Sequence, residues 1–465
     1  MEQNRRTVLK ALASSAMLGV GCAPSTSESP SASSDSGADT GPTGGTDSAV
    51  DTGDLPPLPD GYEEGEWVAE GAEDLDVFPH GLQVGDVTVA SAILSVRAAA
   101  PEVLVEVVGV DESGWWPVHR DTHFLDDRAA QVEVTGLRPD TDYAWVARTT
   151  PDTRSVVGRF RTPPLADTPR VVRFGAVSCL GGNEPWPCLS RAAEEGLDTF
   201  LFLGDTIYAD WGFFGGVQDK WDDALAQQGM RDLTASTSII ATWDDHEVDN
   251  NFNPDNTSAV EIDAGRDAFR EALPQRQGAE GQIWRKVSWG PVDFFVLDCR
   301  GERTGGDYVS RAQLDWLKAA LSESTARFKV ILNSVPITDL SFIPVVGDIA
   351  AEDRWQGFPA QREELVAHCA DIPGVFFVSG DFHVGAAALI DPADSPGGHL
   401  LEVLAGPGGS PVDSAYSLIA EGDRIVRVVP DHNVTVFTCD PATGELTVEW
   451  IGNDGEVLNS LETNL

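Results

Sequence analysis

Five segments of the chain place polar, metal-ligating side chains directly after runs of apolar residues. The motifs are Ser178-Cys179, Asp205-Thr206-Ile207-Tyr208, Asp244-Asp245-His246, Asp298-Cys299-Arg300 and Asp381-Phe382-His383. One Asp after an apolar run is common, because Asp caps helices and begins turns. Five such endings in one chain indicate a shared site.

These side chains have the chemistry that phosphate-ester hydrolysis requires. The reaction needs screening of anionic oxygens, a nucleophile made from water near neutral pH, and help for a departing alkoxide. Paired metal ions meet the first two needs. Two neighbouring cations need a shared carboxylate and further ligands from different strands, and thiolate or imidazole donors favour a transition metal. The five motifs offer that set of donors.

The elements that carry the motifs are expected to be buried strands. From about Arg170 the apolar runs are nearly continuous and alternate with helical stretches such as residues 315–324. This pattern predicts an α/β core with strands buried on both faces. The carboxyl ends of neighbouring strands converge on one rim in such folds. Motifs far apart in the sequence would therefore meet in space.

Residues 66–164 show a different pattern, in which short alternating segments are separated by turn-rich stretches. It predicts a small β-sandwich. Residues 137–143, which end in Tyr143, resemble the tyrosine corner of fibronectin type III-like domains, and residues 160–163 resemble their closing strand. Such modules mostly pack and position, so we interpret His80, His119 and His123 as surface or packing residues.

The N-terminal residues carry an export pattern. Arg5-Arg6 precede a short apolar run, which resembles a twin-arginine signal and is too short to span a bilayer as a stable helix. We interpret residues 1–22 as a signal peptide and expect no transmembrane segment. Cys22 resembles a lipoprotein processing site, although Gly19 stands where such sites prefer Leu, so a lipid anchor at Cys22 stays open.

Residues 23–65 are rich in Ser, Asp, Gly and Pro, which predicts a disordered linker. The protein would then be exported, and be periplasmic, anchored to the cell envelope or extracellular. Of its cysteines, five follow the signal, too few and too scattered for a disulfide scaffold.

The net charge of the chain limits the classes of molecule that it can bind. With 75 acidic against 31 basic residues, the formal charge is −44, which repels nucleic acids and anionic membranes. We expect a monomer that acts on a small phosphate ester.

Together the motifs resemble the PhoD-like alkaline phosphatase and phosphodiesterase family of the calcineurin-like metallophosphatase superfamily. The resemblance covers nearly everything after the linker. It implies a fibronectin type III-like PhoD N-terminal domain over residues 66–164 and a metallophosphatase catalytic domain over residues 169–465. The fold class would be α/β, with a four-layer core in which a β-sandwich is flanked by helices.

The resemblance also implies roles for residues of the motifs. Cys179, Asp205, Tyr208 and His383 would bind a ferric ion, with Asp205 as the bridge to a second metal. That second position, held by Asp245 and Asp381, would take calcium because its donors are hard oxygens.

Other residues would act around the two metals. His246 would serve as general acid or contact the phosphate, and Arg300 would clamp the phosphoryl oxygens. Asp244, Asn250 and Asp353 would support the ligands or bind a further calcium.

The implied reaction is attack of a metal-activated water on phosphomonoesters, phosphodiesters or both. Leu180 and Cys299 stand where many relatives carry Gln and Thr, which leaves the substrate open. One alternative is a phospholipase D-like or polymer-specific phosphodiesterase. The other is a non-catalytic surface-binding protein, whose sign would be lost ligands, and each implied ligand is present.

Overall fold

A computed structural model describes residues 61–126, 129–210, 216–278, 281–343, 353–412 and 419–465. The predicted signal peptide, Cys22 and all of the linker before residue 61 lie outside these ranges. Residues 61–65 were also assigned to the linker, but Glu63–Glu64 form a short strand, β1, that pairs with the strand containing Gly114 and Trp115. Within the described ranges no helix has the length and apolarity needed to cross a membrane.

The described strands form three sheets. The outer sheet contains β1 (Glu63–Glu64), β2 (Ala72–Glu73), β5 (Glu102–Val110), β6 (Gly114–Phe124), β8 (Asp142–Thr150), β9 (Thr153–Arg154) and β10 (Gly158–Arg161). The central sheet contains β3 (Leu82–Gly85), β4 (Ser91–Arg97), β7 (Ala129–Thr135), β11 (Val172–Val177), β12 (Thr199–Leu203), β13 (Ser238–Thr242), β21 (Asn433–Asp440), β22 (Glu445–Gly452) and β23 (Val457–Asn464). The second core sheet contains β14 (Arg285–Trp289), β15 (Val292–Val296), β16 (Phe328–Asn333), β17 (Val375–Ser379), β18 (Gly385–Leu389), β19 (Leu401–Leu404) and β20 (Ile425–Val429).

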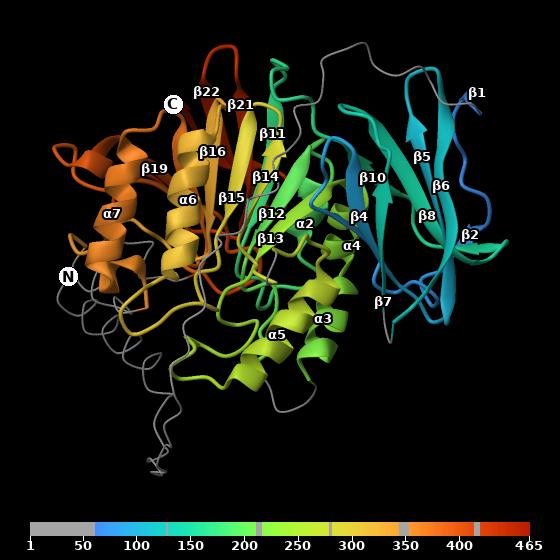
Figure 1. Ribbon diagram of the computed structural model, residues 1–465, viewed down its shortest axis with the longest axis horizontal. Coiled ribbons are helices and arrows are strands. Elements are labelled where there is room, and N and C mark those ends of the chain that lie inside the picture. Colours follow the sequence, from blue (N-terminus) through green and yellow to red (C-terminus); the bar gives the residue numbers. More distant parts are fainter. Residues whose placement is uncertain (1–60, 127–128, 211–215, 279–280, 344–352, 413–418) are drawn as a thin grey trace, which may run out of the picture. The chain divides into compact units, whose positions relative to one another are not determined.

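Helices flank the two core sheets (Figure 1). They are α2 (Pro187–Ala192), α3 (Val217–Leu225), α4 (Gln228–Ser236), α5 (Ala259–Ala272), α6 (Arg311–Glu323) and α7 (Pro359–Ala370), with 3-10 turns at η2 (Trp355–Gly357) and η3 (Pro396–His399). The start of α5 follows a capping box, in which Ser258 accepts from the Glu261 N–H and the Glu261 carboxylate accepts from the Ser258 N–H.

The central and second core sheets pack face to face. Strand β12 shows how, because successive side chains of a strand point to opposite faces. Leu201 and Leu203 belong to the core between the sheets, whereas Phe200 and Phe202 belong to a second cluster that includes residues of α2, α3, α4 and α5. A third cluster joins the other face of the second core sheet to α6 and α7. The order helix, sheet, sheet, helix is the predicted four-layer core.

The N-terminal region forms the predicted sandwich, but one of its sheets continues into the core. Strands β3, β4 and β7 belong to the central sheet, where β3 runs parallel to β13 through the pair Gly85 and Ile239. Asp86, next along the chain, accepts from the guanidinium of Arg285 on β14. A Cβ on Gly85 would lie 1.7 Å from the Pro274 carbonyl oxygen, so only glycine fits at this junction. The two predicted domains therefore share one sheet.

The predicted corner turn is also present. The Tyr143 hydroxyl oxygen accepts from the Arg138 N–H at 2.7 Å, and the Tyr143 ring stacks on Phe160 with centroids 5.1 Å apart. This contact ties β8 to the preceding turn.

Candidate metal centre

The motifs meet because their strands run in parallel. β11, β12 and β13 are parallel neighbours in the central sheet, and β15, β16, β17 and β19 are parallel neighbours in the second. The loops after β11, β12, β13 and β17 carry Cys179, Asp205, Asp245 and Asp381. The two sheets thus supply one cluster from their carboxyl ends.

Asp205 lies at the middle of the first group of donors. Its Oδ2 is 3.4 Å from the Cys179 Sγ and 3.4 Å from the Tyr208 hydroxyl oxygen. The same hydroxyl is 3.4 Å from the His383 Nε2, while the His383 Nδ1 faces the Pro411 carbonyl oxygen at 3.1 Å. The Pro411 contact directs Nε2 toward the other donors. The four residues predicted to bind iron are brought together.

A second group of donors surrounds the same carboxylate. Donor atoms of Asp205, Asp245 and His246 lie within 4.8 Å of one another, as do those of Asp205, Asp244 and Asp381. Asp205 is therefore common to the groups of three or more donors found among the described residues, as expected for a bridging ligand.

The backbone at these positions is held in an unfavourable region. Cys179, Asp205, Asp381 and His383 have φ values of 55°, 54°, 66° and 47°, which L-residues rarely adopt. Such residues gather at functional sites, where the surrounding structure holds them in place. Each sharp turn directs its side chain into the cluster.

Burial disfavours the charged forms of several acidic groups in the cluster. Burial, reinforced by neighbouring carboxylates, raises the pKa of Asp205 well above its ordinary value and that of Asp381 to about 8. Burial and then Asp205 likewise raise the pKa values of the Cys179 thiol and the Tyr208 phenol. One oxygen of Asp205 and one of Asp245, both Oδ1, are buried without a hydrogen-bond partner among the described residues. Cations fit this donor set, because they would satisfy these oxygens and favour the charged forms.

Comparison with known proteins agrees with this arrangement. The sequence model of the family described as PhoD-like phosphatase matches residues 218–449, a range that includes Asp245, Asp381 and His383. The chain belongs to the PhoD-like phosphatase family. The predicted family is therefore confirmed.

Relatives of this PhoD-like chain include alkaline phosphatase D of Bacillus subtilis (strain 168), which is 25% identical over 342 residues. That match covers 59% of this chain and 58% of the relative, so it spans less than two thirds of the curated protein's length.

Two solved structures share the fold. A structure of PhoD matches with a TM-score of 0.69 and 20% identity, over 84% of this chain and 89% of that one. The purple acid phosphatase PPD1 from yellow lupin (Lupinus luteus) seeds matches with a TM-score of 0.62 and 16% identity, over 82% and 73%.

Arg300 of this PhoD-like chain does not have the surroundings of a phosphoryl clamp. Its side chain is fully buried, and its guanidinium donates to both oxygens of Asp244 and both of Asp353 at 2.7–2.9 Å. Carboxylates occupy the donors that would meet phosphate. These bidentate pairs make Arg300 the counter-charge of Asp244 and Asp353, and the clamp role stays a prediction.

Of the three residues predicted to support the ligands, Asp244 and Asp353 are buried in the site and Asn250 is not. Asp244 also accepts from the Ser334 hydroxyl at 2.7 Å, and Asp353 accepts from Arg303. Asn250 and Asn251 are both exposed, and the backbone N–H of Asn251 donates to Asp245 at 2.6 Å. Asn251, and not Asn250, contacts the ligand cluster.

Three residues that the sequence analysis did not single out complete the site. Glu247, fully buried, accepts from the backbone N–H groups of Asp205, Thr206 and Asp244 at 2.8–3.1 Å. The Asp210 carboxylate is 2.8 Å from the His246 Nδ1. The hydroxyls of Ser410 and Tyr208 are 2.7 Å apart. Glu247 comes directly after the Asp244-Asp245-His246 motif, which is the one signal in the sequence that could have pointed to it.

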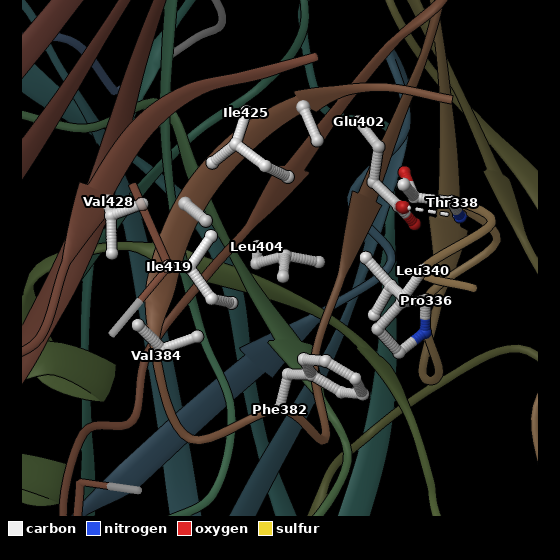
Figure 2. Close-up of a pocket in the computed structure, with 12 residues that line it drawn as sticks. Pro336, Thr338, Leu340, Phe382, Val384, Glu402, Leu404, Ile419, Ile425 and Val428 are labelled. Carbon is white, nitrogen blue, oxygen red and sulfur yellow. Dashed lines mark hydrogen bonds between the residues drawn. The ribbon is translucent and has the colours of Figure 1, made fainter. Parts of the chain in front are cut away.

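Phe382 anchors the turn between Asp381 and His383. Its ring lines a small apolar cavity of about 20 Å³ with Leu340, Val384 and Leu404, as Figure 2 shows. Glu402 closes one side, where it accepts from the Thr338 N–H at 2.8 Å. The space holds about one water-sized group. Its packing fixes Phe382, and thereby the two candidate ligands beside it.

Proposed function

We propose that this chain is an exported, metal-dependent phosphoesterase that hydrolyses small phosphomonoesters, phosphodiesters or both. The observation that carries the proposal is the sharing of Asp205 by every described donor group, together with the unpartnered Oδ1 atoms of Asp205 and Asp245. The names of the relatives support the same reaction class.

Ferric iron would be held by Cys179, Asp205, Tyr208 and His383, and calcium by Asp205, Asp245 and Asp381. The phenolate oxygen of Tyr208 suits a highly charged ion such as ferric iron, and the thiolate and imidazole donors favour a transition metal, whereas carboxylates suit calcium. When bound, the two ions would screen the phosphate oxygens and lower the pKa of a water molecule.

The chain itself would supply the remaining step through His246. Burial alone would lower the pKa of His246, but the carboxylates of Asp205, Asp210 and Asp245 outweigh burial and raise the pKa to about 10. A protonated imidazole whose Nδ1 is held by Asp210 can give the Nε2 proton to a departing alkoxide. This is the general-acid role.

The cysteines support export after folding. All five cysteines of the described residues are buried as free thiols. A chain that folds in a reducing compartment before export would keep them so. For residues 66–164 we retain the fibronectin type III-like class, which the Tyr143 turn supports.

The decisive experiment compares bis-p-nitrophenyl phosphate with p-nitrophenyl phosphate on purified protein, alongside elemental analysis and a visible spectrum. We expect hydrolysis, bound iron and calcium, and a charge-transfer band from the Tyr208 and Cys179 ligands. Chelation should abolish hydrolysis, and added calcium should restore it. Absence of hydrolysis with both metals bound would overturn the proposed function, and a colourless, active zinc protein would overturn the metal assignment.

A further inference from the structure

Two imidazoles face each other on β6, a strand of the outer sheet. The Nε2 atoms of His119 and His123 are 3.2 Å apart, and the rings are stacked with centroids 5.4 Å apart and planes inclined by 21°. β6 belongs to the outer sheet, whereas the candidate ligands follow strands of the two core sheets.

The strand period brings the pair onto one face. His119, Asp121 and His123 pair with Val107, Val105 and Val103 of β5, and alternate residues of a strand share a face. Both imidazoles are half-buried and Asp121 between them is exposed. The site is thus reachable from solvent while its two nitrogens are held toward each other.

The separation matches two ligands of one metal ion. Two imidazole nitrogens at about 2.05 Å from a tetrahedral zinc ion lie about 3.3 Å from each other. We infer that His119 and His123 form a bidentate site for a divalent transition metal of the zinc type, with water completing the coordination. Nitrogen donors favour such a metal over calcium or magnesium.

The local charges favour a cation at this position. Burial, and then the neighbouring His123, lower the pKa of His119, which keeps its imidazole neutral and available as a ligand. The Asp121 carboxylate acts in the opposite direction on that pKa, so it places negative charge beside the pair. A bound cation would be attracted by that charge and by the net charge of the chain.

The test is a titration of the protein, carrying its own metals, with Zn²⁺ alone against a chromophoric chelator. Wild type should bind one more zinc ion than H119Q/H123Q, and each single variant should bind that ion at least about tenfold more weakly. The matched control is His368→Gln, at a histidine of α7 whose Nε2 is 2.9 Å from the Lys318 carbonyl oxygen, and it should behave as wild type.

Phosphatase activity and the thermal midpoint without added zinc should be the same in all of these proteins. Zinc that entered the metal centre would do so equally in wild type and the double variant, and would not produce the expected difference. Equal zinc uptake by wild type and H119Q/H123Q would overturn the inference. His119→Gln and His123→Gln are also made as separate single variants. If one of them fails to fold, the zinc affinity of the other still tests the inference.

Discussion

Asp210 and His246 form a pair at the edge of the ligand cluster. The contact of 2.8 Å involves Nδ1, and the His246 ring lies against that of Tyr208 with centroids 4.0 Å apart. Both neighbours fix the orientation of the imidazole. The proposed general-acid role assigns proton donation to Nε2.

Replacing His246 by Ala should lower kcat for alkyl phosphate esters by about 10²-fold, because a poor leaving group needs the proton. The loss should shrink for p-nitrophenyl esters, whose phenolate departs without one. Asp210→Asn should give a smaller loss with the same leaving-group pattern. The measurement is kcat for both esters, with iron and calcium content and thermal midpoint as controls. An equal loss for both esters would instead make His246 a phosphate-contacting residue, and lost metal would make it structural.

Arg300→Gln tests the difference between a phosphoryl clamp and a buried counter-charge. Removal of one partner from a buried ion network costs about 3–5 kcal/mol, because Asp244 and Asp353 would stay buried with less positive charge. We expect a large drop in the free energy of unfolding, measured by urea denaturation. If the variant kept full stability and showed only a raised KM, the result would support the phosphoryl-clamp role of Arg300.

At the scale of elements, the strand ends decide the site. That the candidate ligands lie together could be predicted from the sequence, because an apolar run followed by Cys179, Asp205 or Asp381 fixes which end of a strand carries the donor. The sequence pattern does not show which residue within a loop faces the site. Asn250 and Asn251 are identical in type and adjacent, and only the turn after His246 determines that the second one contacts Asp245.

Side-chain hydrogen bonds to the backbone of another loop cannot be predicted from the local sequence either. Glu247 reads as a polar loop residue, yet it joins the loop after β12 to the loop after β13 through three N–H groups. Arg300 reads as a cation for phosphate, yet its partners come from two loops distant in sequence. In both cases the partner is set by tertiary structure.

Glu247→Ala should therefore lower both stability and metal affinity. Loss of three buried acceptor contacts should cost about 2–4 kcal/mol, since unsatisfied N–H groups remain. The matched control is Asp198→Ala, another buried carboxylate, which accepts from the Arg173 N–H at 2.9 Å at the start of β11. The Asp198→Ala variant should lose stability but keep its bound metals. Equal metal loss in both variants would contradict a specific role for Glu247.

At the scale of the whole molecule, the buried carboxylates link stability to metal content. Burial raises the pKa of Glu247 to about 7, and burial with Asp244 raises that of Asp381 to about 8. The unfolded carboxyls titrate near pH 4, so between about pH 4 and pH 8 the metal-free folded state holds more protons than the unfolded state. The contribution of these two carboxyl groups to its stability is greatest on the acidic side of this window and is lost as the pH rises through 7 to 8.

Chelated protein should consequently have a lower thermal midpoint at about pH 8.5 than at about pH 5.5, whereas metal-loaded protein should not show this fall, because cations favour the charged carboxylates. Calorimetry of both forms at the two pH values measures the effect. A midpoint of the chelated protein that rose with pH would contradict it.

The sandwich and the α/β core could both be predicted from the sequence, but the sheet that continues from one into the other could not. Alternating segments near residues 91–97 predict strands, and near-continuous apolar runs predict a buried sheet. Whether β3 pairs within the sandwich alone or also with β13 depends on one contact, between Gly85 and Ile239, that local patterns do not encode. Sheet continuity is a property of distant segments.

The position of β11 in the central sheet determines when, during synthesis of the chain, the metal centre can form. β11 lies between β12 and β21, and its antiparallel partner residues extend from Thr435 to Cys439. As the chain leaves the ribosome, β11 appears early, and one of its edges stays unpaired until residues 433–440 have been made. The loop with Cys179 follows that edge. A metal ion can be bound in the final geometry of this site only after residues 433–440 have been made, which places metal insertion after translation of that strand.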